Sequence, residues 1–271
     1  MTSKLIPSNP EEVMVIRKVQ SDIITLNVPF YRFGHVRIGG RCTIVRLQNG
    51  PLAVFSPVAL TQGARDAVNS LGGNVKYIIA PDMEHHIFLT PWKEAYPDAQ
   101  IIAPEGLQEK REKKPETKGI VFDHIFTAVN KGDFKVSDEF HADFDVEYVN
   151  SHPGREIVLL HKSSKTLIEA DLIFNLPATE QFSKSGESAT KGILTKIIRT
   201  LQSTKPPAKG QKRLIWYLLS ARDRKGFAQS VATIDGWNFD RIIPCHGDII
   251  ENGGKEIFRN LFEWNLETAK K

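Results

Sequence analysis

Short runs rich in β-branched residues recur along the chain, and this feature restricts its fold more than any other. A first series comprises residues 13–19, 22–28, 42–47 and 52–56, separated by glycine pairs and turns such as "QNGP". From Leu60 the apolar residues follow helical spacing, and Gly72-Gly73 ends that helix. Residues 75–80 and 99–104 are again strand-like, with a short helix predicted within 87–97. The first part of the chain therefore predicts a sheet backed by helices.

The second part repeats this order. Residues 145–150, 156–161, 165–174 and 239–247 are strand-like, and residues 221–234 and 255–271 have helical spacing. In the last helix Ile257, Phe258, Leu261 and Phe262 would face the core. Two such series predict an α/β fold in which two mixed β-sheets pack face to face with helices outside. We treat residues 1–271 as one domain, with a first half at 13–135 and a second half at 136–265.

A polar and basic segment at 183–212 interrupts the second half and is interpreted as an insertion. Its short helix has one apolar face, formed by Ile193, Leu194, Ile197, Ile198 and Leu201, with lysines and an arginine nearby. The simplest interpretation is a surface helix packed on the body and followed by the flexible stretch "STKPPAKGQK". A lid over a pocket and a weak contact with an anionic membrane are the alternatives.

The charged stretch "GLQEKREKKPETKG", residues 106–119, mixes both signs and contains Pro115. We expect a solvated helix end and loop here rather than a binding site.

Overall composition restricts the class of protein. A formal charge of +4 permits an anionic small-molecule substrate but shows no clustered basic face for nucleic acid. The longest apolar runs are too short for a transmembrane segment, and the first residues lack a secretory signal. Two distant cysteines, Cys42 and Cys245, favour reduced thiols over a disulfide framework. These features predict a cytoplasmic protein, and they leave its oligomeric state open.

Metal-capable side chains lie in or just after the last part of three predicted strands. Glu84, His85 and His86 follow residues 75–80, Asp171 lies in "LIEADLIF", and His246 follows "RIIPC". Ends of neighbouring strands meet at one rim of a sheet, so we expect these side chains to converge. Histidine nitrogen and carboxylate oxygen together suit zinc, iron or manganese.

The order of these segments resembles the metallo-β-lactamase superfamily. The β-rich start, the "EHH" loop, "SHPGR", "LIEADLIF" and "IIPCHGD" follow one another as in that family, over residues 13–265. "FGHVRIGGRCTIVRLQNGPLAVFSPVALT" and "EADLIFNLPATEQF" resemble its divergent, mainly fungal branch, a domain of unknown function. The resemblance implies an αββα sandwich with a metal site at the top, between the two sheets.

The family's first metal site is not retained in this sequence. Its H-x-H-x-D-H motif aligns with residues 81–86, so Pro81 and Met83 replace the first two histidines. The histidine of its P-G-H segment is replaced by Arg155. All three ligands of one metal are thus lost.

The second metal site is retained in altered form. His85 replaces the motif aspartate, His86 matches the motif's last histidine, Asp171 matches the bridging aspartate, and His246 matches the histidine of P-x-H-G. The resemblance therefore implies one divalent metal ion, zinc or iron, held by His85, His86, Asp171 and His246. Four such ligands would saturate tetrahedral zinc, whereas six-coordinate iron or five-coordinate zinc would keep room for water or substrate.

The leading functional hypothesis is a hydrolase of a small-molecule ester, lactone or amide that uses a metal-bound water. Asp171, Arg155 and Glu84 are the candidate catalytic residues. Arg155 would stabilise the oxyanion or bind a substrate anion, and Glu84 would orient a histidine, as would Asp82, or act as general base. The alternatives are a mononuclear non-haem iron enzyme with redox chemistry, and a metal-free pseudoenzyme that binds an anion or a protein partner and in which Arg155 replaces the lost charge. His152 is expected in a surface turn.

Overall fold

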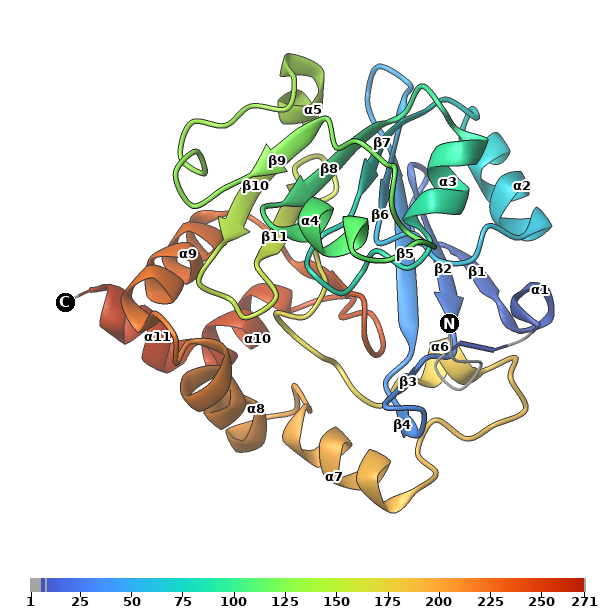
Figure 1. Cartoon of the computed structure of the whole chain (residues 1–271). Helices are drawn as coiled ribbons and strands as arrows, with labels where there is room; N and C mark the ends of the chain where they lie inside the picture. Colours follow the sequence, from blue (N-terminus) through green and yellow to red (C-terminus); the bar gives the residue numbers. More distant parts are fainter. Residues whose placement is uncertain (1–5, 8, 271) are drawn as a thin grey trace.

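Two β-sheets lie face to face at the centre of the computed structural model, which describes residues 6–7 and 9–270 (Figure 1). Part of the amino-terminal stretch that was expected to lack a secretory signal lies outside the described residues. The larger sheet has the strand order β1-β2-β5-β6-β7-β8-β9, and the smaller has the order β10-β11-β12-β13. Both are mixed: β6, β7, β8 and β9 run parallel to one another, as do β12 and β13, while the other pairs are antiparallel. The predicted pair of mixed sheets is confirmed.

The strands of the larger sheet come from the first half of the chain and those of the smaller from the second. The larger sheet contains β1 (Val15–Lys18), β2 (Ile23–Val28), β5 (Gly40–Arg46), β6 (Leu52–Phe55), β7 (Val75–Ile79), β8 (Gln100–Pro104) and β9 (His124–Phe126). The smaller sheet contains β10 (Phe144–Val149), β11 (Glu156–His161), β12 (Thr166–Glu169) and β13 (Arg241–Pro244). A separate hairpin joins β3 (Tyr31–Arg32) to β4 (Val36–Arg37).

The helices cover the outer faces of the two sheets (Figure 1). On the side of the larger sheet are α2 (Gln62–Ser70) and α3 (Leu89–Ala95), and on the side of the smaller sheet are α9 (Arg224–Gly236), α10 (Gly254–Leu261) and α11 (Glu263–Ala269). The shorter helices are α1 (Pro10–Val13), α4 (Leu107–Glu112), α5 (Asp138–Asp143), α6 (Thr179–Phe182), α7 (Ile193–Leu201), α8 (Lys209–Leu214) and the π-helix η1 (Ile215–Leu219).

The central core forms where the inner faces of the sheets meet. Phe55, Tyr77 and Ile102 of the larger sheet pack in one cluster with Tyr148 and Ile157 of the smaller, and all are almost fully buried. Burial of large apolar side chains contributes about 25 cal/mol per Å² removed from water, so this layer is a main source of stability. It also fixes the two sheets against each other and thereby aligns their strand ends.

Several elements differ from the sequence expectation. The strand expected over 165–174 ends at Glu169, because Glu169 and Glu156 accept backbone N–H groups of the following loop. The expected closing helix is two helices that meet at Phe262; Phe258, Leu261 and Phe262 are buried as predicted. The β3–β4 hairpin was not predicted, because two-residue strands leave no detectable periodicity.

Residues 183–212 do not end in a wholly irregular tail, because α8 begins at Lys209. In α7 it is Thr195 that is buried against the body, while Ile193, Leu194, Ile197 and Leu201 are exposed and Ile198 is partly buried. The expectation that the apolar face packs on the body is therefore wrong for most of that face. Thr195 contacts the β3–β4 hairpin, accepting a hydrogen bond from the Arg37 backbone N–H.

Both cysteines, Cys42 and Cys245, are free and buried. Among the described residues, no helix has both the length and the apolar character needed to cross a membrane.

Candidate metal centre

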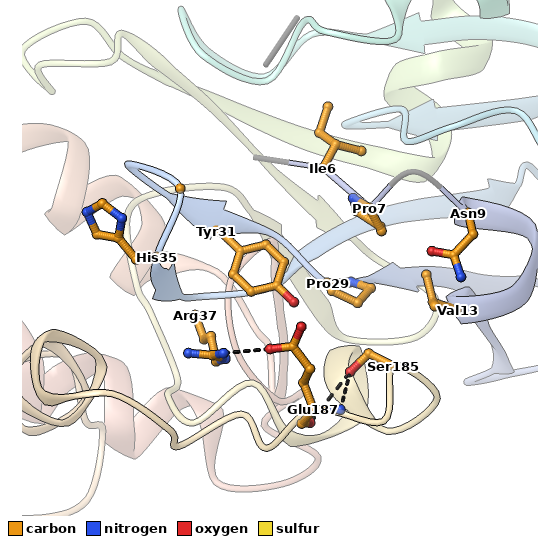
Figure 2. A pocket seen from close by; sticks show the side chains of 11 residues that line it. Ile6, Pro7, Asn9, Val13, Pro29, Tyr31, His35, Arg37, Ser185 and Glu187 are labelled. Atoms are coloured by element: carbon orange, nitrogen blue, oxygen red, sulfur yellow. Dashed lines mark hydrogen bonds and ion pairs between the residues drawn. The ribbon is translucent and has the colours of Figure 1, made fainter. Parts of the chain in front are cut away.

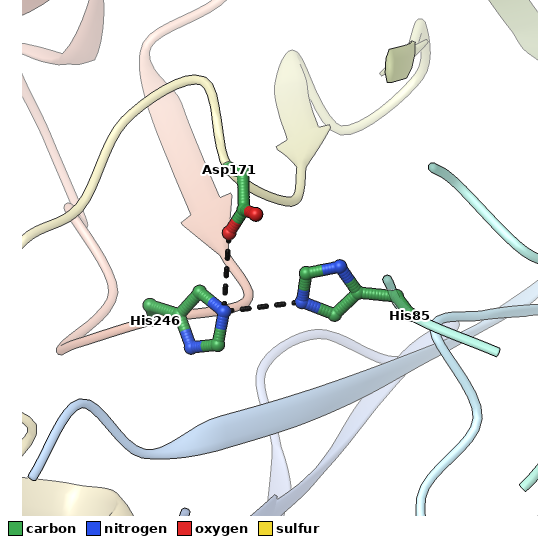
Figure 3. Close-up of side chains that lie close together, drawn as sticks. All are labelled: His85, Asp171 and His246. Carbon is green, nitrogen blue, oxygen red and sulfur yellow. Dashed lines mark hydrogen bonds and ion pairs between the residues drawn. The ribbon is translucent and has the colours of Figure 1, made fainter. Parts of the chain in front are cut away.

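His85, Asp171 and His246 come together at the rim where three strands end (Figure 3). His85 lies in the loop after β7, Asp171 in the loop after β12, and His246 in the loop after β13. One ligand atom from each lies within 4.8 Å of the other two. Because β12 and β13 are parallel neighbours, their carboxyl ends deliver Asp171 and His246 to the same edge. The convergence expected from the sequence therefore occurs for these three residues.

Asp82 fixes the orientation of His85. It is fully buried, and its Oδ1 accepts the backbone N–H groups of Glu84 and His85 at 2.7 and 2.8 Å. Its carboxylate also lies 2.8–2.9 Å from His85 Nδ1. Nδ1 of His85 therefore donates to this carboxylate, and the lone pair is left on Nε2. A carboxylate that holds the far nitrogen of a histidine in this way is typical of metal-ligating histidines.

A backbone carbonyl fixes the orientation of His246. Nδ1 of His246 lies 2.7 Å from the Gly39 carbonyl oxygen, which can only accept, so Nδ1 carries the proton. Gln181 holds the same loop, since its amide donates to the Cys245 carbonyl at 2.8 Å and accepts from the Gly247 N–H at 3.0 Å. The Phe174 ring lies 4.6 Å from the imidazole, centroid to centroid, and covers one side of it.

The two imidazoles direct their Nε2 atoms at each other, and both of these nitrogens carry lone pairs when the rings are neutral. His85 Nε2 and His246 Nε2 are 3.1 Å apart, and His246 Nε2 is also 3.1 Å from Asp171 Oδ1. Asp171 Oδ1 is buried and has no hydrogen-bond partner among the described residues. When both rings are neutral, two lone pairs and a carboxylate oxygen at these distances repel one another; either a proton on His85 Nε2 or a metal ion between the three atoms removes that repulsion. The donor set of two imidazole nitrogens and one carboxylate oxygen fits a divalent transition metal ion.

The electrostatics of the cluster favour a positive charge, either a proton or a metal ion. Burial by itself disfavours a charged His85, but the carboxylates of Asp82 and Asp171 outweigh it and raise the pKa of His85 to about 9. Burial would raise the pKa of Asp171, yet His85 and His246 hold that pKa well below its usual value. The site thus attracts positive charge and keeps its aspartate ionised.

Two buried glutamates accept hydrogen bonds from the backbone of the loop that carries Asp171. Glu156 accepts the N–H groups of Ala170 and Asp171 at 2.8 and 3.0 Å, and Glu169 accepts that of Ile173 at 2.9 Å. Burial, together with neighbouring carboxylates, raises the pKa of both glutamates well above the usual value. Their role in the structure is to hold the backbone that carries Asp171.

His86, one of the four ligands expected from the sequence, lies outside this cluster. Its Nδ1 is 3.1 Å from Arg111 Nη1, and its backbone carbonyl accepts a second Arg111 hydrogen bond at 2.7 Å. Arg111 is itself only 2% exposed and also donates to Thr90 Oγ1, so residues 106–119 are not wholly solvated as expected. Burial and the Arg111 charge lower the pKa of His86 to about 4. The cluster therefore has three candidate ligands rather than four.

The structure places the remaining candidate catalytic residues beside the cluster rather than in it. Glu84 is half-exposed and pairs with Lys110 at 2.9 Å. Arg155 Nη1 donates to the Glu105 carbonyl at 2.8 Å. A Cβ on Gly106 would lie 2.8 Å from Arg155 Nη1 and 3.9 Å from the Met83 methyl carbon. Met83 and Arg155 thus both lie close to Gly106.

His152 was expected in a surface turn, and this expectation is wrong. It is 2% exposed, and its Nδ1 accepts the Gly154 N–H at 3.1 Å, while its buried Nε2 has no partner in the described part of the chain. Burial lowers its pKa, partly offset by the charges of Asp171 and Asp82, so the ring is a neutral neighbour of the site. The turn "SHPG" folds inward because Met83 N–H bonds the Gly154 carbonyl at 3.0 Å, which the sequence alone does not reveal.

A cavity of about 480 Å³ lies apart from the three residues, between the amino-terminal segment, the β3–β4 hairpin and residues 185–187 (Figure 2). The arginine that lines it, Arg37, is 2.5 Å from Glu187, which neutralises its charge. Tyr31 also lines the cavity, and burial and Glu187 raise its pKa to about 12. The described residues around this cavity offer neither an unpaired charge nor a candidate metal ligand set.

Solved structures with the same fold are metallo-β-lactamases and related proteins. The DIM-1 metallo-β-lactamase exposed to ceftazidime aligns with a TM-score of 0.56 and 12% identity over 93% of this chain and 97% of its own. The metallo-β-lactamase FIM-1 from Pseudomonas aeruginosa, in its mono-zinc form, aligns with a TM-score of 0.55 and 11% identity over 95% of each chain. A mutant flavo di-iron protein from Thermotoga maritima aligns with a TM-score of 0.55 and 12% identity over 93% of this chain and 62% of its own. The chain thus has the metallo-β-lactamase fold, as the sequence predicted.

A family model described as a domain of unknown function, DUF4336, matches residues 31–195. The chain belongs to this family, in agreement with the predicted divergent branch. No curated protein matches the sequence.

Proposed function

We propose that the protein is a metal-dependent hydrolase of a small-molecule ester, lactone or amide, with a single divalent ion held by His85, Asp171 and His246. The observation that carries the proposal is the 3.1 Å separation of two Nε2 atoms whose partner nitrogens are both committed as donors. Such an arrangement favours a cation between the rings.

Three protein ligands suit catalysis better than the four inferred from the sequence. Catalytic zinc sites keep three protein ligands and one open position, whereas structural sites use four. When bound, a divalent ion supplies Lewis-acid polarisation of a substrate carbonyl and lowers the pKa of water. The side chains of His85 and Asp171 are 14% and 19% exposed, so solvent reaches the cluster from their side.

The chain's own residues would hold and orient the reactants. Asp82 and the Gly39 carbonyl keep the two imidazoles in the tautomer that presents Nε2. We propose Arg155 as the anchor for an anionic group of the substrate, because the Glu105 carbonyl uses one of its five N–H donors. Glu84 pairs with Lys110 and is assigned no catalytic step.

Hydrolysis of chromogenic ester, lactone and amide substrates tests the proposal. Activity should be lost on chelation, return with Zn²⁺ or Fe²⁺, and fall to background in His246→Ala and Asp171→Asn. Glu84→Gln should remain active, since its side chain lies outside the cluster. Full activity in metal-free protein, or in His246→Ala, would overturn the proposal.

The set of two histidine nitrogens and one carboxylate oxygen also favours a second candidate function. Two histidines and one carboxylate are also the ligands of mononuclear non-haem iron oxygenases, so redox chemistry on iron is the alternative. Iron rather than zinc in purified protein, together with oxygen consumption in place of hydrolysis, would select it. A protein that binds no metal would instead be the pseudoenzyme in which Arg155 supplies the charge.

A further inference from the structure

The segment 183–225 has an unusual charge. It contains eleven lysines and arginines but only two acidic residues, a formal net charge of +9, whereas the whole chain carries +4. The remaining residues therefore carry −5. Both acidic side chains are engaged, Glu187 with Arg37 and Asp223 with the Gly226 N–H at the start of α9. The positive charge is thus concentrated in one contiguous stretch and is not neutralised within it.

The same stretch exposes apolar side chains on α7. Ile193, Ile197 and Leu201 lie at i, i+4 and i+8, with Leu194 beside them, so they form one face of the helix. Their exposed fractions run from 79% for Ile193 to 37% for Leu201. Thr195, on the opposite side, is 2% exposed and bonded to the hairpin. The helix therefore directs its apolar face away from the protein.

Neighbouring elements extend this surface. The segment 193–219, containing α7, α8 and η1, lies along the lower edge of the molecule in Figure 1. The helices α7 and α8 are in close contact, since a Cβ on Gly210 would lie 2.9 Å from the Leu201 Cα. Tyr217 and Leu218 of η1 are 66% and 60% exposed. Exposed lysines and arginines accompany these apolar residues: Lys191, Lys196, Lys205, Lys209 and Arg213.

A cavity of about 620 Å³ opens between α7 and α8. Arg199, Lys205 and Lys209 line it together with Leu176, Pro177 and Pro207. Three cationic side chains around one hollow suit a phosphate-bearing headgroup better than a neutral one. Arg199 lies one turn after Thr195, so the cavity opens on another side of α7 than the exposed apolar face, and its cations add to the positive charge around that helix.

We propose that the α7–η1 surface, residues 193–219, docks the protein on a membrane rich in anionic phospholipid. An interfacial helix of this kind has apolar residues on one side with lysine and arginine beside them, and its affinity combines apolar burial with attraction to anionic headgroups. A protein partner or a second copy could cover the apolar face, but the sequence of this chain contains no comparable acidic segment to neutralise the +9 charge. The membrane supplies both the apolar layer and the negative charge.

Co-sedimentation of the full chain with vesicles tests the proposal. The protein should pellet with phosphatidylcholine–phosphatidylserine vesicles, much less with phosphatidylcholine alone, and less in high salt. Ile193→Ser with Ile197→Ser, and separately Lys196→Glu with Lys209→Glu, should each weaken binding by about tenfold or more. Because all four side chains are exposed, these variants should fold normally.

Matched controls lie elsewhere on the surface. Val121→Ser with Val129→Ser removes two strongly exposed apolar residues, and Lys113→Glu with Lys114→Glu makes the same charge change on another loop. Both should pellet like the wild type. No pelleting of the wild type, or equal loss in the controls, would overturn the proposal. So would a dimer in light scattering that the Ile193→Ser/Ile197→Ser variant dissociates, because a second copy would then cover the face.

Discussion

His85 Nε2 and His246 Nε2 lie 3.1 Å apart, although each imidazole has its Nδ1 held by an acceptor, Asp82 in one case and the Gly39 carbonyl in the other. A proton on His85 Nε2 can bridge the two rings, and a divalent ion that replaces this proton would use both lone pairs and the Asp171 carboxylate. The relationship depends on loops that three separate strands carry to one rim. Changes in those loops therefore have different effects on metal binding and on folding.

Asp82→Asn should weaken metal binding by about 10- to 100-fold, because an amide no longer supplies the negative charge that orients His85. Its Oδ1 can still accept the N–H groups of Glu84 and His85, so the fold should persist. Competition with a coloured chelator measures the affinity. Glu84→Gln is the matched control in the same loop and should bind like the wild type; equal weakening in the control would contradict the assigned role of Asp82.

His86→Ala should leave metal affinity unchanged but lower the free energy of unfolding by about 1–3 kcal/mol, because buried Arg111 loses a hydrogen-bond partner. Urea unfolding and metal titration of the same sample measure the two effects. If His86→Ala instead released the metal, the four-ligand site inferred from the sequence would be correct.

Gly247→Ala should destabilise the His246 loop strongly. Gly247 has φ +94°, and a Cβ there would lie 2.1 Å from the Asn175 carbonyl oxygen, a backbone atom that cannot easily move. Gly72→Ala is the control, since Gly72 has φ +113° and no described atom lies within 4 Å of its Cβ position. The Gly72→Ala control should lower the free energy of unfolding only by the strain of the left-handed backbone, about 1–2 kcal/mol. Thermal unfolding should separate the two variants clearly, and equal losses would show that Asn175 moves aside.

Stability should fall as the pH is lowered, partly through His161. Burial lowers the pKa of this imidazole, an effect that Asp22, 4.0 Å away, only partly offsets. The folded state therefore binds fewer protons than the unfolded state, in which histidine has a pKa of about 6.5. The contribution of His161 is complete above that pH and is lost as the pH falls through the lower pKa of the folded state. Urea unfolding between neutral and mildly acidic pH should show a shallower decline in His161→Gln, and an unchanged slope would contradict this.

The overall fold and three of the candidate ligands were accessible from the sequence. The β-branched runs indicated the order of the strands, and His85, Asp171 and His246 each follow a strand, so their convergence follows from topology. The outer helices α2 and α9 were likewise predicted, because helical spacing of buried apolar residues is a local property.

The direction of individual side chains was not accessible. His85 and His86 are adjacent, and the turn capped by Asp82 sends one imidazole to the centre and the other to Arg111. That Arg111 is buried could not be seen from a stretch of mixed charge, since its partners lie more than twenty residues away. The outward face of α7 depends on hydrogen-bonded contacts of Thr195 and Lys191 with the hairpin segment. Each of these outcomes rests on tertiary contacts rather than on local pattern.

Elemental analysis of gently purified protein tests the central claim most directly. We predict close to one zinc or iron per chain in the wild type and in His86→Ala, and little metal in His246→Ala and Asp171→Asn. We expect this result because the ligand atoms of His85, Asp171 and His246 lie within 4.8 Å of one another and could bind a single ion together. A wild-type protein with far less than one metal per chain, which no added zinc or iron could restore, would contradict the account.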